Sequence, residues 1–204
     1  NSGITWAAGV NKYWNAAAGG NWSDASWATS SGGSVNVNNL PLAQDTAIFE
    51  SSNPNSGTTI TMDFQWQVGT IDMSARTSNT ITLSTSYAFA VYGNFINGTG
   101  TSLTGSGLTL TFAGRTTQTI TSAGKTFPFY FSINTPGGTV SLADTLTTSA
   151  TTSSALNIAA GTFDANGQNV SFTGSTSGVV IQAAVAGTTR TVAIGSGTWT
   201  LAGS

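Results

Sequence analysis

Short alternations of a hydroxyl residue with an aliphatic or aromatic residue recur along most of this chain, and glycine-containing turns separate them. Each alternation has the period of a β-strand and offers only two or three side chains to a core. No segment repeats apolar residues at helical spacing over a useful length. The clearest alternations span residues 80–83, 108–112, 139–142, 156–158, 169–172, 191–194 and 198–201. The chain is therefore expected to be all-β.

Two architectures use strands this short. A sandwich or jelly roll prefers longer strands with regularly spaced turns. A solenoid needs only a few small inward residues per strand, repeated in every coil. Inward pairs recur at irregular intervals of roughly ten to sixteen residues in the second half, which a β-helix tolerates because loops can lengthen without disturbing the stack. We predict an elongated, right-handed parallel β-helix, with a β-sandwich or jelly roll as the alternative.

One aromatic run departs from the pattern of small residues. Residues 127–133 read Phe-Pro-Phe-Tyr-Phe-Ser-Ile, so strand alternation places Phe127, Phe129, Phe131 and Ile133 on one face and Tyr130 on the other. Apolar residues on one face of a strand usually mean burial. We interpret this run as a wide part of the core.

Low charge limits the partners that the protein can have. Only 6% of the 204 residues are charged and the net charge is −2, so no basic stripe exists to neutralise phosphates or anchor the chain to a membrane. No apolar run approaches the ~20 residues that cross a bilayer. Neither nucleic acid nor membrane is an expected partner. A surface of hydroxyls and amides fits an extracellular or particle-bound protein.

The residues for most enzymatic chemistry are missing from the sequence. The chain has no His and no Cys, which excludes Ser-His-Asp triads, His or thiolate metal sites and disulfides. A carboxylate pair remains possible in principle, and Asp63 and Asp72 flank Trp66, but each stands alone among Thr and Ser with only Arg76 nearby. Residues 164–169 resemble a calcium loop only faintly and lack its further acidic ligands. We predict no catalytic residue, no metal and no cofactor.

The N-terminal part is rich in tryptophan. Trp6, Trp14, Trp22 and Trp27 are four of the six tryptophans in the chain. The first coil of a solenoid exposes its interior and an unpaired strand edge, and large rings laid over that end would shield both. We predict that these four indoles form a cap, with Asp24 holding the turn between Trp22 and Trp27 by accepting backbone N–H groups. The alternative is a glycan-binding platform made by Trp14, Trp22 and Trp27.

The same region resembles a known group of proteins. The residues that carry the resemblance are Tyr13–Asn15, Gly20–Trp27, Ser30–Gly33 and Pro41–Phe49, followed more diffusely by Gly138–Thr147 and Ala160–Val170. They are similar to the openings and repeats of β-helical virion and tail-appendage proteins of tailed phages, cyanophages among them, and of related bacterial surface proteins. Two departures are the segment Asn15–Gly20 in place of a Gly-rich link, and Glu50 where the group usually has Asp.

The resemblance implies a structural or adhesive role and brings no catalytic residue with it. We therefore expect a non-enzymatic component of a phage particle or appendage, located in the virion or at a cell surface. Its expected partners are other copies of itself or other virion proteins, with host-surface polysaccharide as a further partner. The alternatives are a secreted bacterial adhesin or filament subunit and, third, a polysaccharide hydrolase. Residues 1–50 are expected to form the cap and 51–204 the coils, in a native polypeptide that extends beyond one or both ends.

Overall fold

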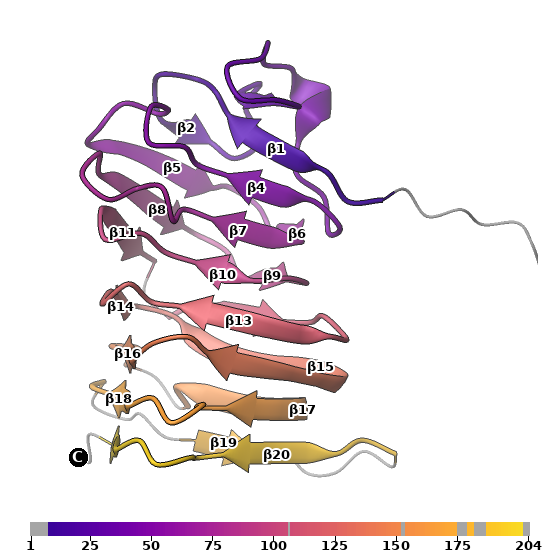
Figure 1. Cartoon of the computed structure of the whole chain (residues 1–204), viewed down its shortest axis with the longest axis vertical. Coiled ribbons are helices and arrows are strands. Elements are labelled where there is room, and N and C mark those ends of the chain that lie inside the picture. The colour runs from indigo at the N-terminus through magenta and orange to yellow at the C-terminus, as the bar shows by residue number, and fades with distance from the viewer. Residues whose placement is uncertain (1–7, 106, 152–153, 175–178, 182–186, 202–204) are drawn as a thin grey trace, which may run out of the picture.

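A computed structural model describes residues 8–105, 107–151, 154–174, 179–181 and 187–201 of the chain. Within these residues the structure is all-β except for a short 3-10 helix, η1 (Val37–Asn39). The strands stack as parallel coils of a β-solenoid with about six turns, elongated along one axis (Figure 1). This confirms the predicted fold class. Among the described residues no helix is long and apolar enough to span a bilayer.

The strands form three ladders that run along the solenoid. The first ladder contains β1 (Asn11–Trp14), β4 (Thr46–Ile48), β7 (Thr70–Asp72), β10 (Phe95–Ile96), β13 (Thr117–Thr121), the ends of β15 (Tyr130–Leu142) and β17 (Leu156–Asp164), and β20 (Arg190–Ala193). The second contains β2 (Gly20–Asn21), β5 (Thr58–Met62), β8 (Ile81–Thr85) and β11 (Thr101–Thr104), then β14 (Thr126–Phe127), β16 (Leu146–Thr148), β18 (Val170–Phe172) and β21 (Trp199–Leu201) as a separate sheet. The third contains β6 (Gln67–Val68), β9 (Phe89–Val91), β12 (Thr109–Phe112), the starts of β15 and β17, and β19 (Val179–Ile181).

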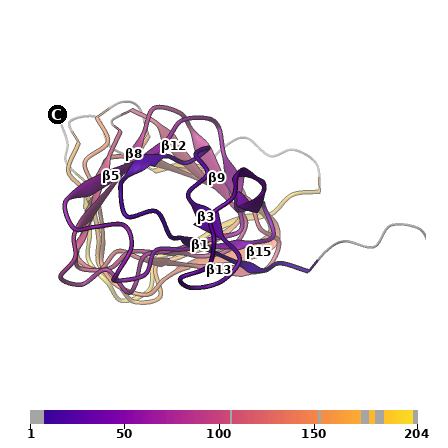
Figure 2. The ribbon, with the colours of Figure 1, turned by 90° about the horizontal axis from the view of Figure 1, so that it is seen from above.

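Each coil visits the three ladders in turn. In the first ladder Ile71 pairs with Phe95, Phe95 with Ile120 and Ile120 with Leu142, so a coil takes up about 24 residues, within the usual range of solenoid repeats. The first-ladder strands face the viewer in Figure 1 and run from right to left as the chain descends, which makes the β-helix right-handed (Figures 1 and 2). Successive coils superimpose around one closed outline when viewed along the axis (Figure 2).

The core consists of inward columns, one layer per coil. In the first ladder, register aligns the buried residues Ala47, Ile71, Phe95, Ile120 and Leu142. The third ladder aligns Val68, Val91, Phe112, Ile133 and Ile158, which are also buried. Thr and Ser occupy the alternate, outward positions of strands such as β8 and β12. The strands therefore show the inward–outward alternation of side chains that the sequence predicts.

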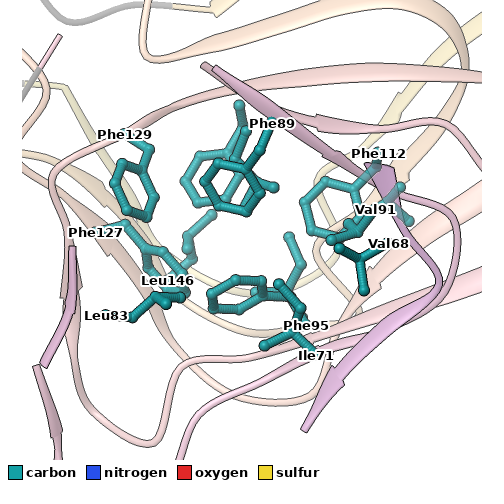
Figure 3. Packing of buried hydrophobic residues seen from close by; sticks show 14 of the residues in the cluster. Val68, Ile71, Leu83, Phe89, Val91, Phe95, Phe112, Phe127, Phe129 and Leu146 are labelled. Atoms are coloured by element: carbon teal, nitrogen blue, oxygen red, sulfur yellow. The ribbon is translucent and has the colours of Figure 1, made fainter. Parts of the chain in front are cut away.

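The aromatic run widens the core as expected. Phe127, Phe129, Phe131 and Ile133 are buried, whereas Tyr130 is half-buried on the other face. The Phe129 ring meets the Phe89 ring edge-on at 5.6 Å between centroids, and Phe127 lies 5.7 Å from Phe95. Figure 3 shows these rings filling the interior, with Leu83 and Leu146 beside them. These large rings occupy inward positions in the middle coils.

Two strands, β15 and β17, continue around a corner of the solenoid. Each begins in the third ladder and ends in the first, and their pairing shifts register between Ile133 and Thr139. Gly161 lies at this corner with a φ of 86°, in a region that side chains other than glycine rarely adopt. A Cβ at this position would lie 2.1 Å from the Thr135 carbonyl oxygen of the coil above. Only glycine lets the two backbones approach this closely.

The N-terminal segment belongs partly to the coils. β1 pairs in parallel with β4, and β2 with β5, so the first two ladders begin well before residue 50. The strand β3 (Trp27–Ala28) pairs antiparallel with β1. The hydrogen-bonded ladders therefore show no break at the predicted boundary between cap and coils.

Replacement of Gly161 by Ala tests the corner. We expect G161A to lose about 2–5 kcal/mol of unfolding free energy, because a steric clash adds to the backbone strain. Gly124 is the matched control: its φ is 72°, but nothing lies within 4 Å of a Cβ there, so G124A should lose only about 1–2 kcal/mol. Urea unfolding of both variants measures the difference, and equal losses would contradict the proposed clash.

Candidate functional site

Three tryptophans gather at the N-terminal end of the solenoid. The Trp14 and Trp27 rings meet edge-on at 5.3 Å, and the Trp22 and Trp27 centroids lie 4.7 Å apart. All three rings also lie within about 6 Å of the Phe49 ring, which belongs to the first full coil. Trp14, Trp22 and Trp27 are each 0% exposed. The cluster thus forms the topmost layer of the hydrophobic core.

Backbone pairing positions these rings. Trp14 lies at the end of β1 and faces Trp27 of β3 across the antiparallel pair. Trp22 follows β2, and its N–H donates to the Thr61 carbonyl of β5 at 2.7 Å. The chain between β2 and β3 therefore crosses over the top of the coils. This path brings the three indoles together.

The three indole N–H groups differ in their hydrogen bonding. Trp14 Nε1 donates to the Ala18 carbonyl at 3.2 Å, and Trp27 Nε1 donates to the Trp22 carbonyl at 2.9 Å. Trp22 Nε1 is buried without a hydrogen-bond partner. Trp22 consequently holds its place through ring packing and its backbone.

Carboxylates fasten the loops around this cluster. Asp24 Oδ2 accepts the Asn21 N–H at 2.7 Å and so holds the turn that leads to Trp27. Asp45 accepts the N–H groups of Val10 and Leu42, both at 3.0 Å. These side chains satisfy loop donors over the end of the core.

The alternative glycan platform at Trp14, Trp22 and Trp27 gains no support from this geometry. A sugar stacks on an exposed ring face, and these three rings present none. The rings are also mutually tilted or edge-on rather than coplanar. Trp6, the fourth residue of the predicted cap, lies outside the described residues.

Asp63 anchors the end segment to the coil below. Its carboxylate accepts the Ser23 N–H and hydroxyl and, at 3.1 Å, Trp66 Nε1. Burial alone would raise the pKa of Asp63, but the hydrogen bonds from Ser23 and Trp66 outweigh it and lower the pKa. A carboxyl held in its ionised form by three donors is suited to fastening the loop that carries Trp22.

Asp72 has a separate environment. It ends β7 in the first ladder, whereas Asp63 follows β5 in the second, and Asp72 Oδ1 accepts the Ser74 N–H at 2.9 Å. In the described part of the chain no three acidic, His or Cys side chains gather as a metal site would require. Asp164, in the segment weighed as a calcium loop, accepts the Asn166 N–H at 2.8 Å and supports the Asn-Gly turn.

Arg76 is the charged residue that burial affects most visibly. Its side chain is fully buried and donates to the carbonyls of Ser51 and Pro54, and burial lowers its pKa. These contacts tie together the loop between β4 and β5. The guanidinium therefore stabilises this loop through hydrogen bonds to backbone carbonyls and not through a pair with a carboxylate.

The last described coil exposes its inward residues. Among the described residues, β19, β20 and β21 each pair only with the strand above them. Ile181 continues the column of Ile158, and Leu201 continues that of Phe172, yet they are 57% and 54% exposed. Ile194, one residue beyond the Ala193 that pairs with Asp164, is 53% exposed. The inward columns buried in every higher coil are thus uncovered in the last described one.

Sequence reasoning also missed a group of aromatic residues on the side of the solenoid, of which Phe64, Tyr87 and Tyr92 are exposed and Trp66 is half-buried. Phe64, Trp66, Tyr87 and Tyr92 cluster where β6 and β9 begin and end. A cleft of about 320 Å³ opens beside Trp66 and Tyr92. These four residues, with the buried Phe89, are the aromatic residues between positions 64 and 92 and were the available signal, but they are spread over two coils, and only the register brings them together.

Comparison with protein-family models, with curated proteins and with solved structures gives no match. The similarity to phage virion proteins therefore depends on the sequence motifs alone.

Trp22 tests the role of the closed end. We expect Trp22→Ala to lose about 3–5 kcal/mol of stability as a fully buried large-to-small change, and to expose an apolar end that aggregates. Trp22→Phe should lose much less, because it keeps a ring and removes a buried N–H without a partner. Thermal melts and light scattering measure both effects; a small loss for Trp22→Ala would contradict the packing role.

The lowered pKa of Asp63 makes its contribution depend on pH. A depressed carboxyl pKa stabilises the fold above the unfolded-state pKa of about 3.9, and that stabilisation is lost as pH falls through the folded-state pKa. Asp63→Asn should therefore destabilise the protein at about pH 7, and the difference from the parent should shrink near pH 3. Urea unfolding at the two pH values checks this; a constant difference would argue against an ionised anchor.

Proposed function

We propose that this protein is a non-enzymatic structural component of a phage particle or appendage, in which the exposed apolar residues of the last described coil are covered by a further β-structured partner. The observation that carries the proposal is the contrast between the two ends. The N-terminal end is closed by buried indoles, whereas the last described coil exposes Ile181, Ile194 and Leu201 beside unpaired strand edges. Such an edge is a ready template for pairing with another β-structured element.

The burial of the first coil argues against head-to-tail growth of a filament. Filaments grow when two different complementary surfaces join head to tail. Here the chain crosses over the first coil and places the buried Trp22 and Trp27 on it, so the described residues of this end offer no exposed apolar column. A secreted bacterial adhesin remains the second candidate, favoured by the exposed aromatic cluster on the side of the solenoid.

The surface composition supports a location in a virion or at a cell surface. Outward strand positions carry Thr and Ser, and charged residues make up only 6% of the chain. The two carboxylates considered as a catalytic pair support a structural role instead. Asp63 accepts hydrogen bonds from three donors, and Asp72 lies in another ladder. Shortening of a polysaccharide by the purified protein, abolished by Asp63→Asn, would favour a hydrolase instead.

In isolation we expect the open end to be covered by a second copy. Two identical ends can meet about a two-fold axis, with edge strands pairing antiparallel and the exposed columns buried against each other. The closed N-terminal ends then face outward and stop further growth. The assembly should therefore end at a dimer.

A double substitution tests this arrangement. The parent protein should be a dimer by light scattering at tens of micromolar, and Ile181→Lys with Ile194→Lys should yield a folded monomer, because two lysines cannot be buried unpaired. Leu42→Lys is the matched control, since Leu42 is 53% exposed in the N-terminal segment. It should leave the dimer intact. A monomeric parent, or a control that dissociates equally, would overturn the proposal.

A further inference from the structure

The outward face of the third ladder carries a cleft with a floor of small residues. Register aligns Gln67, Ala90 and Thr111 across β6, β9 and β12, and the next outward row contains Tyr92, Ala113 and Asn134. Because the side chains of Ala90 and Ala113 are short, they form a low floor. The larger side chains of Trp66 and Tyr92 stand beside this floor and border a space of about 320 Å³. The cleft therefore crosses the strands on a floor held by backbone ladders.

An aromatic platform adjoins the cleft. The rings of Phe64 and Tyr87 are stacked, with centroids 6.3 Å apart and planes 16° apart, and Trp66 meets Phe64 edge-on at 6.1 Å. Phe64 is 61% exposed, Tyr87 44% and Tyr92 37%. These rings leave much of their apolar surface in water, so they contribute less to folding than buried rings of the same size. A contiguous exposed aromatic surface of this kind is typical of a binding site.

The polar groups that line the cleft are neutral. Its lining contains the amides of Gln65, Gln67 and Asn134 and contains no charged side chain. The Tyr92 hydroxyl donates to Gln67 Oε1 at 3.0 Å, and Trp66 Nε1 donates to Asp63, so both aromatic walls are fixed by hydrogen bonds. A partner with phosphate or carboxylate groups would find no cation here to pair with.

We propose that this cleft binds a neutral saccharide chain. A sugar ring combines an apolar C–H face, which suits Trp66 and Tyr92, with hydroxyls that suit the surrounding amides. Because the cleft crosses β6, β9, β12 and β15, its length along the axis is about 14 Å at the usual strand spacing, enough for a short oligosaccharide. The site does not involve the C-terminal end and is independent of the proposed attachment there.

Calorimetric titration with neutral hexasaccharides tests the proposal. The probes are maltohexaose, cellohexaose, β-1,4-mannohexaose and the hexamer of N-acetylglucosamine, with a hyaluronan hexasaccharide and heparin as acidic comparisons. At least one neutral probe should bind with a Kd of about 1 mM or lower, and the acidic probes should bind more weakly. Failure of every neutral probe at about 10 mM, or tighter binding of the acidic ones, would overturn the proposal.

Two variants locate the binding. Tyr92→Ala removes a wall, and Ala113→Glu places a charge and added volume on the outward floor; each should weaken binding about tenfold or more while the melting temperature changes little. Leu42→Ala, which removes an exposed apolar side chain that does not line the cleft, should bind like the parent. Unchanged affinity in both cleft variants would place the saccharide elsewhere and overturn the assignment.

Oligomeric state separates this inference from the proposed function. The two cleft variants should keep the dimer, and the monomeric double lysine variant should keep saccharide binding. If the saccharide contact fails while the dimer persists, the cleft assignment alone is wrong. If the cleft variants abolish dimerisation instead, the aromatic surface is a contact between copies and the saccharide proposal is overturned.

Discussion

Each layer of this core is covered only by the coil above and the coil below. The columns from Ala47 to Leu142 and from Val68 to Ile158 are continuous because the strands are parallel and in register. Within the solenoid that arrangement buries the inward side chains between the neighbouring coils. At its two ends the same arrangement leaves a full layer of apolar side chains without a neighbour, and this constraint governs the rest of the molecule.

The two ends meet this constraint differently. At the N-terminal end an irregular crossing segment delivers three indoles, whose width lets a few residues cover the area that a whole coil would otherwise cover. Asp63 then ties this segment to the coil below through Ser23. In the last described coil, Ile181, Ile194 and Leu201 occupy inward positions but are exposed. Among the described residues the inward columns are therefore covered at the first coil and uncovered at the last.

The sequence predicted the repeating part of this fold better than its special sites. All seven alternations fall on strands, because the period of two is a local property that survives in every coil. The strands between residues 46 and 72 were not singled out; β4, β6 and β7 have only two or three residues each and carry too little pattern to stand out, although β5 has five. The burial of Trp22 and the exposure of Phe64 follow from the path of the chain at the corners and the end, which local composition does not specify. The sequence therefore left two roles open for the tryptophans, an end cap and a glycan-binding platform, and only the strand register distinguishes between them.

A parallel β-helix separates folding from recognition more completely than most architectures. Inward positions must match the layers on both sides, whereas outward positions contact little beyond their neighbours on the same face. Most outward positions in this chain carry Thr or Ser. These residues favour the strand conformation, and their hydroxyl groups form hydrogen bonds with water without adding any specific contact. Against that background, two alanines beside Trp66 and Tyr92 are a departure that the fold does not require. Because exposed rings such as Phe64 and Tyr87 add little to stability and increase the risk of aggregation, their presence on this face is the reason to propose a ligand there.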